Sequence, residues 1–135
     1  MSQENVERIR AAVDAWNSGG FEGMRYFIHP DAVTTPFEEW PDGDVYYGIE
    51  GFETLTKEWT EQFEGIRWDI ERIEPLEGGD ALALVNQHGT IKGAGVPVSA
   101  PLGVLVGDFH DDGRAAKVEF FLGWDKALEA VGLSE

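Results

Sequence analysis

The chain has 135 residues, of which 42% are hydrophobic and 12% aromatic, and it contains no cysteine. This length and composition predict one folded domain, and they exclude a disordered chain, disulfides, thiolate catalysis and cysteine–zinc sites. The formal net charge of −16, from 26 acidic and 10 basic residues, argues against nucleic acid and anionic membrane surfaces as partners. Because no apolar run is long enough to span a membrane and the first residues do not resemble a signal peptide, we expect a cytoplasmic protein.

The first third of the chain predicts two helices and a short strand. Apolar residues recur at helical spacing from Val6 to Trp16, and the glycine pair at 19–20 predicts the end of this helix. A second helix is expected over Phe21 to Ile28, and His29-Pro30-Asp31 should break it. A short strand is expected over Ala32 to Phe37.

A loop from Glu38 to Tyr47, which contains Pro41-Asp42-Gly43-Asp44, separates this strand from a third helix. That helix should begin at Gly48, carry its apolar stripe as far as Phe63 and end at Gly65. Beyond it the apolar period changes from helical to two residues, which is typical of strands. Strands are expected at Ile66–Ile70, Ala81–Lys92, Val98–His110 and Arg114–Gly123, followed by a short helix at Asp125–Val131.

Helices that precede a run of hairpin-linked strands indicate an α+β domain with an antiparallel sheet. We find no internal repeat, low-complexity segment or linker, so residues 1–135 are expected to form a single domain.

Several short motifs along the chain carry a family resemblance. In order they are Asp14-Ala15-Trp16-Asn17-Ser18-Gly19, His29-Pro30-Asp31-Ala32-Val33, Tyr47-Gly48-Ile49-Glu50-Gly51-Phe52, Gln87-His88-Gly89-Thr90 and Val118-Glu119-Phe120-Phe121. Together they resemble the SnoaL-like branch of the nuclear transport factor 2-like (ketosteroid isomerase-like) superfamily, from about Val6 to Leu133. The resemblance implies a cone: a curved sheet that wraps N-terminal helices around one apolar pocket. The superfamily includes isomerases, cyclases, hydrolases and non-catalytic binding modules, so the fold alone selects no function.

The resemblance also allows the chemistry of two subfamilies to be tested. Ketosteroid isomerase-like catalysis needs a carboxylate base, a tyrosine and a protonated aspartate. These positions fall on Thr35, on Ala12, and on Gly103 or its neighbour Leu102, so all three groups are missing.

Limonene epoxide hydrolase-like catalysis needs two aspartates bridged by an arginine inside the pocket. Arg67, Arg72 and Arg114 are expected to point outward, and no arginine is expected within the apolar faces. Polyketide cyclase-like chemistry, which asks for a single acid–base group in an apolar cavity, remains open.

Strand alternation assigns side chains to faces. By resemblance, the pocket face of the Ala81–Lys92 strand is the one that carries Leu82, Leu84, Asn86 and His88. His88 is then the candidate catalytic acid or base, with Asn86 as a polar anchor. The alternative is a histidine satisfied by a bond to a neighbour.

The neighbouring strands add further candidates for ligand contact. On the same face Gly103 would leave room for a ligand, and Val118 and Phe120 would line the pocket on the last strand.

Tryptophans and an acidic loop complete the candidate site. Trp16 and Trp59 form either flat walls for a ring-shaped ligand or ordinary core packing. Trp124 is expected to cap the pocket, and Glu39 lies either at the pocket mouth or in a solvated loop.

No glycine-rich phosphate loop or nucleotide signature is present, so no cofactor is expected. The cluster Asp108, His110, Asp111 and Asp112 lacks calcium-loop spacing, so no metal is expected. The sheet face opposite the pocket should carry apolar residues suited to a homodimer, namely Val85, Leu102, Val104, Val106 and Phe121.

Two main functional hypotheses follow. The first is an acid–base enzyme that acts on a hydrophobic, carbonyl- or ring-bearing metabolite. The second is a non-catalytic pocket for a hydrophobic ligand, and a dimeric interaction module is a further alternative.

Overall fold

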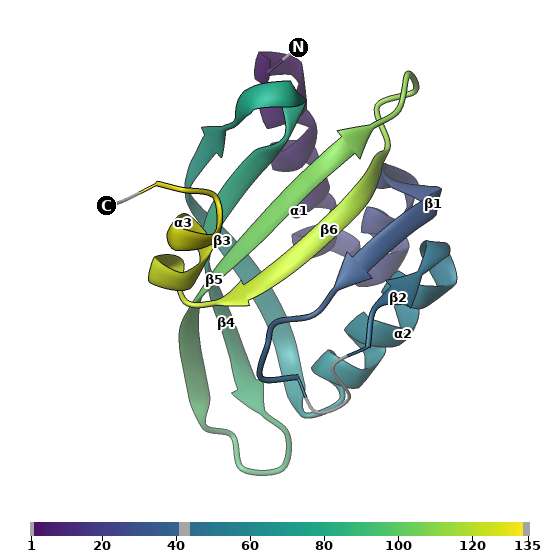
Figure 1. Ribbon diagram of the computed structural model, residues 1–135. Coiled ribbons are helices and arrows are strands. Elements are labelled where there is room, and N and C mark those ends of the chain that lie inside the picture. Colours follow the sequence, from purple (N-terminus) through teal and green to yellow (C-terminus); the bar gives the residue numbers. More distant parts are fainter. Residues whose placement is uncertain (1, 41–43, 134–135) are drawn as a thin grey trace.

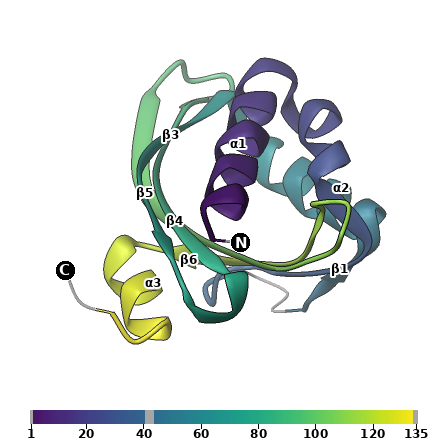
Figure 2. The same cartoon turned by 90° about the horizontal axis from the view of Figure 1, so that it is seen from above.

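A curved sheet of six strands wraps around the long N-terminal helix in the computed structural model (Figures 1 and 2), which describes residues 2–40 and 44–133. Pro41, Asp42 and Gly43 of the expected loop lie outside the described residues. The helical segments are α1 Ser2–Met24, η1 Arg25–Phe27, α2 Gly48–Thr60, η2 Glu77–Gly79 and α3 Trp124–Ala130. The strands are β1 Ile28–Thr35, β2 Tyr46–Tyr47, β3 Phe63–Pro75, β4 Ala81–Ile91, β5 Pro97–Phe109 and β6 Ala115–Leu122.

The strand order is β2-β1-β6-β5-β4-β3, and the pair β1–β6 is parallel. The α+β class is therefore confirmed, but the expectation of a purely antiparallel sheet is wrong. The connection from β1 to β6 contains α2 and four further strands, so no hairpin forces these two strands to run in opposite directions. Register shifts between Glu64 and Arg67, and between Ile70 and Arg72, mark irregularities in β3 that are typical of a strongly bent sheet.

The glycine pair at 19–20 interrupts the helical path as expected, because α1 consists of two helices that join across a kink at Gly20. Gly20 has φ 60° and ψ −146°, a conformation that a side chain would disfavour. The expected second helix is too long, however, because Ile28 is already the first residue of β1. Pro30 fits inside that strand because the β1–β6 pairing is interrupted between Ile28 and Val33.

The third helix is shorter than its apolar stripe suggests. α2 ends at Thr60, and Phe63 belongs to β3, where it pairs with Ile91. The helical spacing of Phe63 from Trp59 is therefore coincidental, although both side chains still turn toward the interior.

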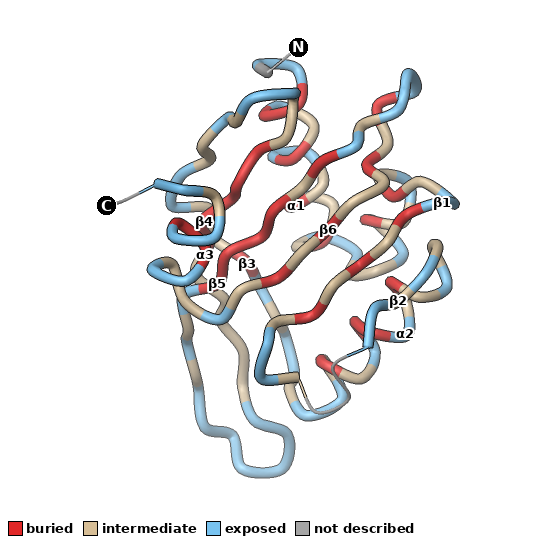
Figure 3. Tube along the Cα trace, in the orientation of Figure 1, coloured by how far each residue is buried: buried red, intermediate tan, exposed pale blue. Residues whose placement is uncertain are grey.

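Two apolar clusters hold the fold together. The larger one fills the concave side of the sheet beneath α1 and α2, with Phe52, Leu55 and Phe120 almost fully buried. The smaller one lies on the opposite face, where α3 covers the start of β4. Buried residues accordingly follow the middle of the strands in Figure 3. No helix in residues 2–40 and 44–133 is long and apolar enough to cross a bilayer.

Candidate functional site

The face of β4 that we expected to line the pocket is in fact the outer face of the sheet. Leu82 and Leu84 pack in the outer cluster with Leu128 of α3, whereas Ala83 and Val85 face the helices. Both faces of β4 are apolar near its start, so alternation alone cannot say which face meets α1 and which meets α3. If the alternation is assigned one residue out of register, every side chain of the strand is placed on the wrong face.

His88 therefore lies on the outer surface with 42% of its side chain exposed. Its Nε2 is 3.1 Å from Asp69 Oδ2 and its Nδ1 is 2.7 Å from Ser99 Oγ. In the neutral imidazole a carboxylate partner calls for the proton on Nε2, and Ser99 then donates to Nδ1. Hydrolases also use the order Ser–His–Asp, but these side chains stand on an exposed strand surface that does not exclude water. The expected pocket placement of His88, and of Asn86 on the same face, is wrong.

Gly103 and Trp124 hold α3 against this outer face. A Cβ on Gly103 would come within 2.3 Å of Ala127 Cβ, so the missing side chain admits the helix and not a ligand. Trp124 begins α3, and its Nε1 donates to the carbonyl oxygen of Val85 at 2.9 Å. Neither residue, nor Leu84, lines a cavity on the concave side, which corrects their expected placement in the pocket.

Glu39 is also engaged outside the cavities. Its carboxylate pairs with Lys126 of α3, and the hydrogen bond from that ammonium group lowers the pKa of Glu39. The same bond raises the pKa of Lys126. A carboxylate held in its charged form by a lysine is a poor candidate for a base that swings into the pocket.

The inward placement of Trp16, Trp59, Val118 and Phe120 agrees with the expectation. These residues do not, however, line one empty cone. Trp16 stacks on Trp68 with ring centroids 4.9 Å apart and an interplanar angle of 12°. Trp59 meets Phe120 edge-on at 5.1 Å. The aromatic rings thus fill the centre of the interior, and two hollows beside them bear on function.

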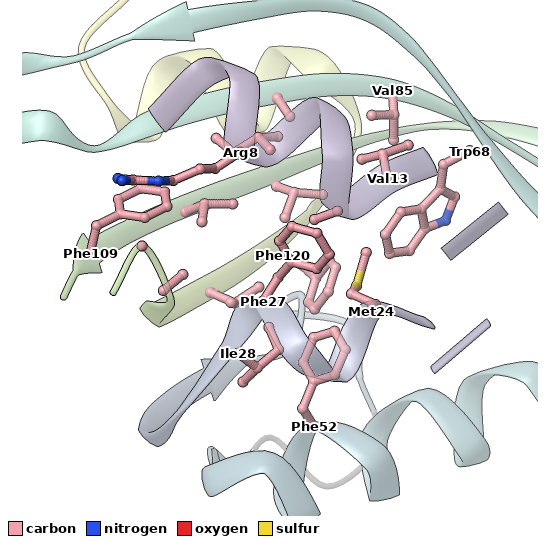
Figure 4. A pocket seen from close by; sticks show the side chains of 18 residues that line it. Arg8, Val13, Met24, Phe27, Ile28, Phe52, Trp68, Val85, Phe109 and Phe120 are labelled. Atoms are coloured by element: carbon pink, nitrogen blue, oxygen red, sulfur yellow. The ribbon is translucent and has the colours of Figure 1, made fainter. Parts of the chain in front are cut away.

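The first hollow, here called the inner chamber, lies between α1 and the sheet and has a volume of about 50 Å³ (Figure 4). Its walls are apolar except for Arg8, whose guanidinium lies beside the Phe109 ring at one end. Arg8 corrects the expectation that no arginine approaches the apolar faces. Ala12, at the tyrosine position of the isomerases, also lines this chamber. One water molecule takes up about 30 Å³ of the liquid, so the chamber is too small for a metabolite.

The second hollow, here called the rim cavity, has a volume of about 320 Å³. Typical small-molecule sites measure about 300–1,000 Å³, so this cavity is large enough for a ring-shaped ligand. It opens between the end of α2, the start of β3 and the β4–β5 hairpin, and its lining residues are Phe37, Trp40, Trp59, Gln62, Phe63, Ile66, Gln87, Gly89, Val98, Ser99, Ala100 and Leu122. No titratable side chain occurs in this described lining.

Three aromatic side chains form one wall of the rim cavity. Phe37, Trp40 and Trp59 lie within 5.5–6.2 Å of one another, measured between ring centroids. Behind this wall, Trp40 Nε1 donates to Tyr46 Oη at 3.1 Å, and Tyr46 Oη donates to Glu58 Oε1 at 3.3 Å. The hydrogen bond fixes Trp40 in place as a flat apolar surface.

Gln87 supplies the polar group on the inner side of the rim cavity. Trp68 Nε1 donates to Gln87 Oε1 at 2.8 Å, which ties this lining residue of the rim cavity to the stacked tryptophans of the core. Sequence alternation assigns Gln87 to the outer side of the sheet, so its place in the cavity could not be predicted. The cross-strand pairing of Gln87 with Trp68 was the signal that links it to the interior.

The homodimer remains a prediction, but most of the apolar residues expected on its interface are buried inside the protomer. Val85, Leu102, Val104 and Val106 belong to the concave core and do not form an exposed face. Phe121 alone of that set lies on the outer side, where it packs against the α3 cluster.

Comparison with known proteins places the chain in a family. Residues 9–118 match the sequence profile of the SnoaL-like domain, whereas no functionally curated protein matches. A candidate polyketide cyclase from Xanthomonas campestris superposes with a TM-score of 0.74 at 18% identity, covering 97% of this chain and 98% of that one. A candidate SnoaL-like polyketide cyclase from Jannaschia sp. CCS1 gives 0.73 at 18% identity, covering 99% and 95%.

A third solved structure, TerC co-crystallized with polyporic acid, gives a TM-score of 0.73 at 17% identity, covering 95% of this chain and 97% of that one. Identities this low establish a shared fold and no shared activity. The profile match spans most of the sequence, and the motifs, the curved mixed sheet and the solved neighbours agree with it. The chain therefore belongs to the SnoaL-like domain family, with the nuclear transport factor 2-like fold.

Proposed function

We propose that this protein binds a small, uncharged, ring-bearing hydrophobic molecule in the rim cavity. The observation that carries the proposal is a ligand-sized cavity with an aromatic wall and no titratable side chain in its described lining. Flat apolar walls bury ring faces well. Acid–base catalysis, by contrast, needs a titratable group within hydrogen-bond reach of the substrate.

The net charge of the protein and the lack of charged groups in the described lining favour an uncharged ligand. The formal net charge of −16 disfavours the approach of an anion. A cation would find aromatic faces but no carboxylate among the lining residues. A neutral molecule avoids both penalties. That one solved neighbour was co-crystallized with polyporic acid supports the use of this fold for an organic ligand.

Acid–base catalysis on such a molecule is the second candidate, as in a cyclase, isomerase or hydratase. The observation in its favour is the Tyr46–Glu58 hydrogen bond directly behind Trp40, which brings two titratable groups close to the aromatic wall. For either group to reach a bound molecule, Trp40 would have to move.

The binding proposal is tested with 1-indanone, a small bicyclic ketone, by ligand-observed NMR and tryptophan fluorescence. Ala100→Phe should fill the rim cavity and abolish binding, because Ala100 lines it. Ala130→Phe adds the same side chain on the exposed surface of α3 and should leave binding intact. Equal binding by both variants would refute the site.

His88→Ala tests whether His88 lies outside the binding site, as in the structure, or inside it, as the sequence analysis expects. Since His88 lies on the outer face, we expect 1-indanone to bind this variant as tightly as it binds the unmodified protein. A tenfold or greater loss of affinity for 1-indanone in this variant would show that His88 belongs to the binding site after all.

A further inference from the structure

We propose that the rim cavity selects ligands that carry a hydrogen-bond acceptor, such as a ketone, and that Gln87 makes this selection with its amide nitrogen. The inference rests on the proposed function of the cavity and specifies its ligand class. It follows from the way in which Trp68 fixes the orientation of the Gln87 amide.

The oxygen and nitrogen of a glutamine amide differ in what they can bind. An indole Nε1–H is a donor only, so its partner must be an acceptor. The 2.8 Å contact from Trp68 Nε1 therefore identifies the oxygen of Gln87, and the amide cannot be flipped without leaving that buried indole N–H unpaired.

Trp68 itself cannot turn away. It is 4% exposed, it lies parallel to Trp16, and its backbone N–H and carbonyl oxygen are both bonded to the side chain of Asn17 of α1. The orientation of the amide is thus set by the core of the protein and is ready before a ligand arrives.

The remaining end of the amide is the nitrogen, which offers two hydrogens. In the part of the chain that the structure describes, no contact occupies Gln87 Nε2, and Gln87 lines the rim cavity. A buried carbonyl of a ligand would satisfy this donor, whereas a hydrocarbon of the same shape would strip water from it without replacement.

The other amide and hydroxyl groups of the described lining are less suited to this choice. Gln62 is exposed at the edge of the cavity, and no hydrogen bond fixes its amide within the described residues. Ser99 directs its hydroxyl to His88 on the outer face, and the indole N–H of Trp40 already donates to Tyr46. Among the side-chain amides of the described lining, Gln87 is therefore the one whose direction a hydrogen bond fixes.

The test compares 1-indanone with indane, which has the same bicyclic skeleton without the carbonyl. We expect the unmodified protein to bind 1-indanone more tightly, by roughly three- to tenfold beyond the difference in their transfer from water. Gln87→Glu keeps an oxygen for Trp68 and removes both donors, so this preference should vanish or reverse while indane binding changes little.

Asn86→Asp is the matched control, because it adds the same charge on the neighbouring residue of β4 but on the outer face of the sheet, outside the described lining of the cavity. We expect it to keep the preference for 1-indanone, and circular dichroism verifies that both variants are folded. A preference that survives in Gln87→Glu, or that Asn86→Asp loses equally, would overturn the assignment.

A second variant tests the role of Trp68. Trp68→Phe frees the amide to rotate, so the preference for the ketone should fall even though Gln87 is still present. An undiminished preference would show that Trp68 does not fix the orientation of the Gln87 amide.

The two proposals can fail separately. If both probes bind the unmodified protein with equal affinity and Ala100→Phe abolishes the binding of both, the selection by Gln87 is wrong but the binding site is correct. If neither probe binds, the proposed function itself fails.

Discussion

The indoles of Trp16 and Trp68 lie nearly parallel with ring centroids 4.9 Å apart, yet among the described residues only one of their two N–H groups has a hydrogen-bond partner. Trp68 Nε1 donates to Gln87 Oε1, whereas Trp16 Nε1 is buried without a hydrogen bond among the described residues. The two side chains are similarly buried, at 5% and 4% exposure. The pair therefore provides an internal comparison between a satisfied and an unsatisfied buried donor.

Trp16→Phe should destabilise the protein less than Trp68→Phe. Both changes remove the same atoms from one stack, and each should cost some packing free energy. Trp68→Phe in addition leaves Gln87 Oε1 without its donor, whereas Trp16→Phe removes a donor that has no partner in the part of the chain that the structure describes. We expect the free energies of unfolding, measured by urea denaturation, to differ by about 1 kcal/mol. Equal losses would mean that water or another group satisfies Trp16 Nε1 in solution.

Gly103→Ala should weaken the docking of α3. The new Cβ would meet Ala127 Cβ at 2.3 Å, so the helix must shift, and we expect a loss of about 1–3 kcal/mol in urea denaturation. Gly19→Ala, where nothing lies within 4 Å, serves as the control and should change stability by less than about 0.5 kcal/mol. The second change Ala127→Gly should recover part of the loss from Gly103→Ala. Additive losses in the double variant would contradict this contact.

The helices and strands of this fold could be predicted from the sequence because apolar residues recur at different spacings in the two. Which face of the sheet meets the helices could not be predicted. The helical stripe of α1 and the two-residue period of β3 each depend on neighbouring residues alone. Which side of β4 meets α1 depends on where α3 docks, and the close approach of Gly103 to Ala127 that permits this docking is not encoded in any period. One reversed face accounts for the misplacement of His88 and the failure to identify Gln87.

The aromatic part of the site was more predictable than its polar part. Trp59 and Phe120 lie on apolar stripes whose inward side is unambiguous, since the opposite side is charged. The aromatic side chains are numerous enough to fill most of the interior. The free volume that remains depends on side-chain packing, which a sequence pattern does not specify. The position of the rim cavity therefore emerges only from the structure.

Arg8 should contribute to stability through its aliphatic stem more than through its charge. The stem covers the end of the inner chamber beside Phe109 (Figure 4), and its guanidinium donates to Asn5 Oδ1 at 2.8 Å. Arg8→Met keeps most of the apolar cover, so we expect a loss within about 1 kcal/mol, whereas Arg8→Ala should lose more because it opens the chamber to water. Urea denaturation of both variants measures the difference, and an equal loss would assign the contribution to the charge.

Lys117 should stabilise the protein up to alkaline pH and lose this effect beyond. Its ammonium group donates to Asp80 Oδ2 at 3.0 Å, and this hydrogen bond raises the pKa of Lys117 above its usual value of 10.5. A pKa that is higher in the folded state means that folding favours the proton. The stabilisation is therefore complete below the unfolded pKa and is lost as pH rises through the folded pKa.

We accordingly expect Lys117→Met to lower the free energy of unfolding at about pH 8, and the gap from the unmodified protein to close toward about pH 12. The loss should stay below about 1 kcal/mol, because 39% of the Lys117 side chain is exposed and water screens the pair. Lys57→Met, which removes a lysine with a 75% exposed side chain from a surface pair with Glu53, is the control for the change in net charge. Urea denaturation as a function of pH measures both variants. A gap for Lys117→Met that widens with rising pH, after subtraction of this control, would contradict the assigned direction of the pKa shift.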